Sequence, residues 1–154
     1  MNPIASDEQQ FYTFLSKLSE KSGRQPIKEI IERCKNLGIS YLYSLEKLDL
    51  SHCALKEIPE FIQILKNLKK LRLINNQLSN LPENLSNLEQ LNTIELENNM
   101  LESFPASLLA IGKKRKRDKK RFNIYLHNNP MDFVPFSLQS MIVTRPHCET
   151  MDDY

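Results

Sequence analysis

The residues best suited to chemistry are two His-Cys pairs, in which an imidazole could activate a neighbouring thiol. They are His52-Cys53 and His147-Cys148. A nucleophilic cysteine needs a base and a site built around it. The chain has only three glycines, and it contains no Gly-rich phosphate loop, no nucleophile elbow and no repeated Cys/His spacing typical of metal ligands. We therefore expect no catalytic residues, no cofactor and no metal site.

A second group with chemical potential is a basic run that gives the segment 113–121 a net charge of +7, against −5 for the rest of the chain. Its basic members are Lys113, Lys114, Arg115, Lys116, Arg117, Lys119, Lys120 and Arg121. The first four match the spacing of a nuclear-import signal, which an import receptor would read. Phosphates of a nucleic acid or another acidic surface are alternative partners, and a solvated loop without a partner is also open.

A repeated pattern organises the segments between these residues. The apolar spacing of residues 45–55 returns at 68–78, at 91–101 and, in part, at 121–131. Counted from one position in each unit, Cys53, Asn76 and Asn99 are 23 residues apart, and Asn129 follows after 30. Each unit continues with an apolar residue and a proline, which are Ile58-Pro59, Leu81-Pro82, Phe104-Pro105 and Val134-Pro135. No ordinary amphipathic helix would keep this register.

On these residues the chain resembles a leucine-rich repeat protein, because residues 42–141 follow the spacing Leu-x-x-Leu-x-Leu-x-x-Asn-x-Leu-x-x-Leu-Pro. The 23-residue form is similar to intracellular repeats of the Ras-suppressor type and to repeat proteins of bacterial pathogens. The resemblance implies an α/β fold: a leucine-rich repeat solenoid of about four repeats with a short parallel β-sheet on its concave face. It also implies that Asn76, Asn99 and Asn129 form a hydrogen-bonded ladder, from which Cys53 departs.

Strand geometry predicts where the side chains of a repeat point. Because side chains alternate along a strand, Leu48 and Leu50 should enter the core while Asp49 points outward. The same register places Cys53 inside the turn and His52 just outside it, so the repeat itself explains why they are adjacent. The Pro-containing segments should return over the convex side, because Pro cannot pair within a central strand.

The outward positions of successive strands should form three rows on the concave face, which the family uses to bind proteins. The rows are Lys47, Lys70, Thr93 and Asn123; then Asp49, Arg72, Glu95 and Tyr125; then Ser51, Ile74, Glu97 and His127. This mixed polarity favours a protein partner with patches of both signs. We expect Arg72, Ile74 and Tyr125 to be its anchors. For Asp49, Arg72 and Glu95, the alternative is that the charges pair with one another across the sheet.

The two ends of the array need separate explanations. Helices over 7–21 and 26–37 predict an N-terminal helical cap, residues 1–40, that covers the open end of the first repeat. Repeats should occupy 41–143, with the basic insertion 112–121 projecting as an accessible loop, and 144–154 should be a flexible tail. The strand at 124–126 would be an exposed edge, open to self-association or a partner, unless residues 136–143 fold over it.

Composition limits the class of protein. A hydrophobic content of 40% and a charged content of 26% are typical of a soluble globular protein. No apolar run approaches the roughly 18 residues of a membrane span, the N-terminus does not resemble a secretory signal, and the odd number of cysteines fits a reducing compartment. We expect a non-enzymatic protein-interaction module in the cytoplasm or nucleus. The resemblance leaves open a bacterial effector inside a host cell.

Overall fold

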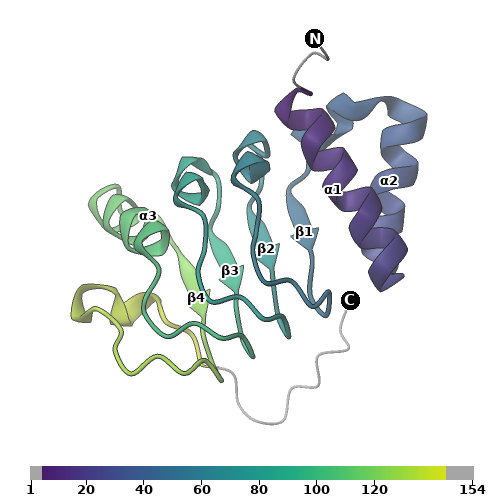
Figure 1. Cartoon of the computed structure of the whole chain (residues 1–154). Coiled ribbons are helices and arrows are strands. Elements are labelled where there is room, and N and C mark those ends of the chain that lie inside the picture. Colours follow the sequence, from purple (N-terminus) through teal and green to yellow (C-terminus); the bar gives the residue numbers. More distant parts are fainter. Residues whose placement is uncertain (1–4, 145–154) are drawn as a thin grey trace.

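Four short parallel strands form one sheet in the part of the chain that the computed structural model describes, residues 5–144. They are β1 (Lys47–Asp49), β2 (Lys70–Arg72), β3 (Thr93–Glu95) and β4 (Asn123–Tyr125), ordered as in the sequence. After each strand the chain turns and crosses back on the opposite side, so the strands line the inner curve of a solenoid (Figure 1). The leucine-rich repeat solenoid predicted from the sequence is confirmed.

The register of the sheet matches the rows predicted from the sequence. Lys47 pairs with Lys70, Lys70 with Thr93, and Thr93 with Asn123. The next row pairs Asp49, Arg72, Glu95 and Tyr125 in the same way. Between these rows, the central residue of each strand is at most 1% exposed: Leu48, Leu71, Ile94 and Ile124. One side of the sheet therefore supplies the core, and the other presents the rows.

The convex side is built from short helices, each of which begins directly after the proline that recurs at the same position of every repeat. These are the 3-10 helices η2 (Glu60–Ile64), η3 (Glu83–Asn87) and η4 (Phe136–Met141), and the α-helix α3 (Ala106–Arg117). Each proline has the extended backbone that precedes a helix, as its ring favours. Each helix contributes one completely buried side chain to the core: Ile62, Leu85, Leu108 and Leu138.

Two helices and a 3-10 turn close the N-terminal end, as predicted: α1 (Asp7–Ser22), α2 (Gln25–Leu37) and η1 (Ile39–Ser44). The Ser6 hydroxyl accepts a hydrogen bond from the Gln9 amide at 3.3 Å and caps α1. Gly23 ends that helix in the left-handed conformation, at φ 66°. Phe11 of α1 is fully buried, and its ring meets that of Phe61 in η2 edge-on at 6.2 Å. Aromatic packing therefore joins the cap to the first repeat.

The predicted basic loop is the main correction to the sequence-based fold. Instead of projecting as a loop, its first half extends α3 to Arg117, and the chain leaves the helix only at Asp118. Gly112 lies against η4, where an added Cβ would approach Leu138 to 2.7 Å. The extra residues of the third repeat are therefore used to lengthen a helix that packs on its neighbour.

The C-terminal edge adopts the covered alternative. Ile142 forms a parallel bridge with Ile124, and the Val143 amide donates to the Ile124 carbonyl at 2.9 Å. The edge of β4 is therefore paired at its centre, which removes the reason for predicting self-association there. The predicted flexible tail, apart from Thr144, lies outside the described residues, as does His147-Cys148.

Candidate functional site

A ladder of asparagine side chains holds the turns that follow the strands. The Asn76 amide nitrogen donates to the carbonyls of Leu50 and Leu73, each at 3.0 Å, and its oxygen accepts from the amides of Cys53 and Leu55. Asn99 and Asn129 repeat the pattern one strand further along. The geometry is that of the ladder predicted from the sequence. Each amide joins its own repeat to the one before it.

Cys53 stands where this ladder has no earlier strand to reach. Its thiol donates to the Ser51 carbonyl at 3.4 Å, the equivalent of the weakest contacts that Asn76 and Asn99 make within their own turns. Because β1 is the first strand of the sheet among the residues that the structure describes, an amide here would find no earlier repeat to join. The departure at Cys53 therefore follows from its position at the closed end.

A second ladder, which the sequence reading missed, lies outside the first. His52, Asn75, Asn98 and Asn128, each just before a ladder position, have left-handed backbone with φ of 56° to 58°. Their side chains meet in pairs: Asn75 contacts the His52 ring at 3.2 Å, and Asn128 donates to Asn98 at 2.6 Å. Asn tolerates this conformation better than most residues, so the doubled Asn was the available signal. His52 acts in a turn and is not paired with the Cys53 thiol.

Charged side chains form a continuous series of ion pairs across the concave face. Arg24 and Arg72 both contact Asp49 Oδ2, at 3.3 Å each. Arg72 Nε then contacts Glu95 at 2.8 Å, and Lys70 Nζ contacts the other oxygen of Glu95 at 2.7 Å. The alternative weighed for Asp49, Arg72 and Glu95 is therefore the one found. Through Arg24, which precedes α2, the series also ties the cap to the sheet.

These contacts correct the expected exposure of several predicted partner-binding residues. Arg72 is 8% exposed, Glu95 1%, Glu97 5% and Ile74 1%. For Arg72 and Glu95 the cause is their mutual pairing, which folds both side chains down onto the sheet. Ile74, predicted to be an exposed anchor, is buried too. More of the surface is left to Lys47 and His127, which are exposed, and to half-buried Asp49, Lys70 and Tyr125.

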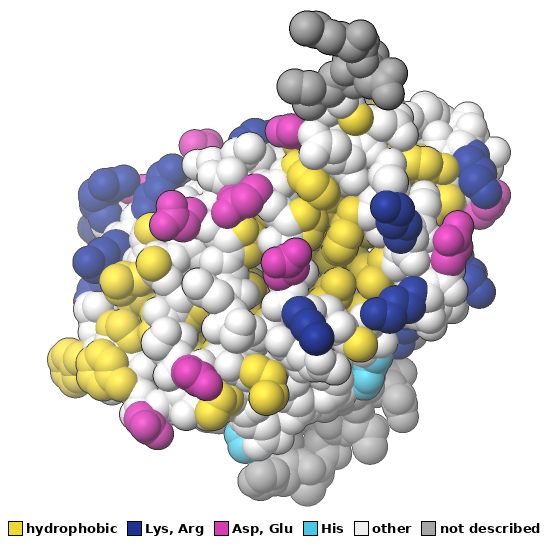
Figure 2. Space-filling model, in the orientation of Figure 1, with side chains coloured by type: hydrophobic (Ala, Val, Ile, Leu, Met, Phe, Trp, Pro, Cys, Tyr) yellow, Lys and Arg dark blue, Asp and Glu magenta, His cyan; other side chains and the backbone are white. Residues whose placement is uncertain are grey.

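A cavity of about 240 Å³ opens where the cap meets the sheet. Apolar side chains of both parts line it, including Ile30 of α2, Tyr41 of η1 and Leu48 of β1, together with charged side chains that include Lys47 and Lys70. Figure 2 shows hydrophobic side chains in this hollow and Lys or Arg side chains around it. The arrangement can hold an apolar side chain of a partner while placing positive charge beside it.

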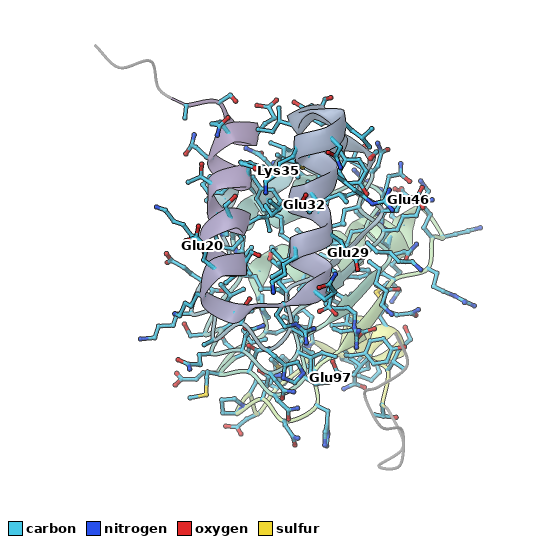
Figure 3. All side chains as sticks on the ribbon, turned by 90° about the vertical axis from the view of Figure 1, so that its right-hand side faces the viewer. Glu20, Glu29, Glu32, Lys35, Glu46 and Glu97 are labelled. Carbon is cyan, nitrogen blue, oxygen red and sulfur yellow. The ribbon has the colours of Figure 1, made fainter. Side chains whose placement is uncertain are left out.

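The outer face of the cap carries a second, wider groove between α1 and α2. Figure 3 shows the two helices side by side, with Glu29, Glu32 and Lys35 along α2 and Glu20 on α1. Lys35 donates to Glu32 at 2.8 Å, and this hydrogen bond raises the pKa of Lys35. Charged residues of both signs line the groove together with apolar side chains that include Tyr12, Ile31 and Leu37.

The basic run does not act as one surface. The Arg115 guanidinium is buried, 5% exposed, and it donates to the carbonyls of Glu89 and Leu91. Lys114 contacts Glu89 at 3.5 Å, and Arg117 contacts Asp118 at 3.2 Å. An import receptor reads an extended accessible segment, so the helix and the buried Arg115 contradict the structural premise of that prediction. The exposed members are Lys113, Lys116, Arg117, Lys119, Lys120 and Arg121.

The two described thiols are placed for packing. Burial raises the pKa of the Cys34 thiol. Burial also raises the pKa of the Cys53 thiol, partly offset by a hydrogen bond with Ser22 and the charge of Arg24. Both thiols are therefore protonated and poorly nucleophilic at neutral pH. Within residues 5–144, no three His, Cys, Asp or Glu side chains are grouped as metal ligands. Across the same residues, every helix is too short or too polar to traverse a bilayer.

Comparisons with known proteins agree with this architecture. Residues 43–83 match a family model described as leucine-rich repeats, two copies. A leucine-rich repeat protein of Leptospira interrogans is similar in structure, with a TM-score of 0.52 and 29% identity over 68% of this chain. The leucine-rich repeat domain of the type III effector XopL has a TM-score of 0.52 and 16% identity over 90% of the chain, which shows the fold alone. The chain spans 24% and 51% of these proteins, respectively. No curated protein matches in sequence.

Proposed function

The chain is a leucine-rich repeat protein, and from that premise we propose that it is a non-enzymatic module that binds a protein partner on the concave face of its sheet. Proteins of this family are typically interaction modules. The observation that carries the proposal is the cavity between α2, β1 and β2, because it joins an apolar floor to a charged margin on that same face. Interfaces gain most of their affinity from such central pockets.

The ion-pair series supports this function by fixing the surface before a partner arrives. Arg72 and Glu95 are each held by two ion-pair contacts to neighbours in the sheet, so their side chains lose little freedom on binding. Preorganised side chains reduce the entropic cost of association. In this proposal Arg72 and Glu95 position the site, whereas Lys47, Lys70, Tyr125 and His127 contact the partner.

Affinity capture with matched variants tests the proposal. Lys47→Glu with Tyr125→Ala changes the concave face without removing a buried side chain. Lys66→Glu with Met100→Ala is the control, because both residues are exposed and lie outside the strands. A partner bound on the concave face should be recovered by the wild type and the control but reduced at least tenfold by the first variant. Equal recovery by all three proteins would refute the proposed site.

The place of action is a further part of the proposal. We place the chain in the cytoplasm or nucleus, or in the interior of a host cell if it is a bacterial effector. A fluorescent fusion in a eukaryotic cell, compared with a Lys116→Gln and Lys119→Gln variant, measures nuclear accumulation. Loss of accumulation in that variant would revive import by the basic segment, despite its helical structure.

A further inference from the structure

Two phenylalanines near the C-terminal end are the most exposed large apolar side chains that the structure describes. Phe133 is 69% exposed and Phe136, the first residue of η4, is 84% exposed. Single exposed hydrophobic residues are ordinary. Two aromatic rings three positions apart, at an end covered by one bridge between Ile124 and Ile142, form a feature that needs a separate explanation.

Five cations of the basic run form no ion pair with another residue that the structure describes. Lys113, Lys116, Lys119, Lys120 and Arg121 are all exposed, and within residues 5–144 none of them forms an ion pair. The ion pairs of the basic run are made by Lys114 and Arg117, and Arg115 is the member with a buried guanidinium. Packing does not explain the five exposed cations.

The cations and the aromatic rings are neighbours in space. Lys116 Nζ donates to the carbonyl of Ser137, the residue after Phe136, at 3.4 Å. One turn earlier, Gly112 of α3 lies against Leu138 of η4. Figure 2 shows Lys and Arg side chains gathered over α3 and, beside them, hydrophobic side chains protruding at the margin of the molecule. Positive charge and apolar rings therefore share one end of the solenoid.

We propose that this end of the solenoid binds the surface of an anionic phospholipid bilayer. The five cations contact the headgroups, and Phe133 and Phe136 enter the boundary between headgroups and acyl chains. Peripheral membrane binding requires this combination of buried apolar area and attraction to anionic lipid. It needs no membrane-spanning helix, and it leaves the concave face free for the partner.

A single-stranded nucleic acid could use the same cations, but the geometry favours lipid. Nucleic acids are bound in basic grooves that follow the backbone, with aromatic platforms along them. Here Phe133 and Phe136 are 69% and 84% exposed, and Figure 2 shows hydrophobic side chains protruding at the margin of the molecule. Protruding rings can insert into a bilayer without any groove.

Vesicle sedimentation with the full chain tests the charge requirement. We expect binding to phosphatidylserine-containing vesicles, weakened by salt, and little binding to phosphatidylcholine alone. Lys116→Gln, Lys119→Gln and Lys120→Gln together should lower the affinity about a hundredfold, at about fivefold per lysine. The matched control is Lys17→Gln, Lys21→Gln and Lys28→Gln, three exposed lysines of the cap that should not matter.

The aromatic requirement can be read directly, because the chain contains no Trp. Phe133→Trp or Phe136→Trp introduces a single fluorophore at an exposed site. Its emission should shift to the blue with anionic vesicles and be quenched by brominated acyl chains. Leu37→Trp, at an exposed position 63% accessible on the cap, is the control and should not respond. Phe133→Ser with Phe136→Ser should reduce vesicle affinity about tenfold.

Four results would overturn the proposal. The first is no binding to anionic vesicles by the wild-type chain when circular dichroism confirms that it is folded. The second is binding without a Trp shift, which leaves only surface attraction. The third is displacement of the protein from vesicles by a single-stranded oligonucleotide whose own binding requires both phenylalanines. That result would assign this end of the solenoid to nucleic acid. A concentration-dependent dimer abolished by Phe133→Ser and Phe136→Ser, without vesicle binding, would instead assign it to a second copy of the chain.

Discussion

The two ends of the solenoid solve the same problem in opposite ways. At the N-terminal end, α1, α2 and η1 bury the first repeat under Phe11, Leu15 and their neighbours, and the ion pair of Arg24 with Asp49 fixes the cap to the sheet. At the C-terminal end, one bridge and η4 cover β4 while Phe133 and Phe136 stay in solvent. The difference teaches that a solenoid end can be closed by a large buried contact, as at the first end, or by a small one that leaves apolar rings exposed, as at the last.

The largest test of this difference replaces one aromatic ring at each end. Phe11→Ala should lower the free energy of unfolding by about 3–5 kcal/mol, because it empties a fully buried site that joins the cap to η2. Phe136→Ala should change it by less than about 0.5 kcal/mol, because the ring is 84% exposed. Denaturant titration measures both. Equal losses would mean that the two ends contribute alike to the core.

The asparagine ladder provides the second test, within the array. Asn76→Ala should cost about 3 kcal/mol, since it removes the side chain that satisfies the buried Leu50 carbonyl and two buried amides, whereas the Leu73 carbonyl keeps its hydrogen bond from Asn99. Cys53→Ala should cost about 1 kcal/mol, because the thiol makes only one weak contact within its own turn. Thermal and chemical unfolding of the two variants compares them. A Cys53 effect as large as that of Asn76 would contradict a ladder that starts at the second repeat.

The third test uses backbone strain in the first turn. Ala54 has φ of 51°, although its counterparts in the later repeats do not have positive φ. An alanine in this region is strained, so Ala54→Gly should stabilise the protein by about 1 kcal/mol. Ala110→Gly, an exposed alanine inside α3, should destabilise by about 0.5–1 kcal/mol. The two melting temperatures should move in opposite directions, and a fall in both would show that Ala54 is not strained.

The smallest expected effect is a pH dependence confined to the closed end. Burial raises the pKa of the Cys34 and Cys53 thiols in the folded protein. Thiols in the unfolded chain therefore ionise first as the pH rises, and the stabilisation present at neutral pH is lost through the alkaline range. Between pH 7 and pH 10, the free energy of unfolding should fall more steeply for the wild type than for the Cys34→Ala, Cys53→Ala double variant. Parallel curves would exclude the thiols as the cause.

Prediction from the sequence succeeded where a property depends on position within one repeat. The strand register and the roles of Asn76, Asn99 and Asn129 follow from a spacing that neighbouring copies must share. It failed where a property depends on a partner elsewhere. Nothing in a run of like charges indicates that Arg115 will find the carbonyls of Glu89 and Leu91.

The concave face shows the same boundary between what spacing determines and what it does not. Alternation along the strand correctly places Arg72 and Glu95 on the outer side of the sheet, at adjacent positions. Their burial depends on the rotamers that let Arg72 reach both Asp49 and Glu95, which the repeat pattern does not specify. The left-handed residues are an intermediate case, since the doubled Asn carried a signal but His52 concealed it in the first copy.

The asparagine ladder gives the array a direction. Each amide draws its second set of partners from the repeat before it: Asn99 from Leu73 and Leu78, and Asn129 from Leu96 and Leu101. Every repeat therefore supplies the hydrogen-bond partners that the asparagine of the next repeat needs. A truncation from the C-terminal side removes each ladder asparagine together with its own repeat, and the ladder asparagines of the remaining repeats keep their hydrogen bonds. A truncation from the N-terminal side that includes the first repeat leaves the Asn76 side chain without Leu50 and Cys53, its hydrogen-bond partners there.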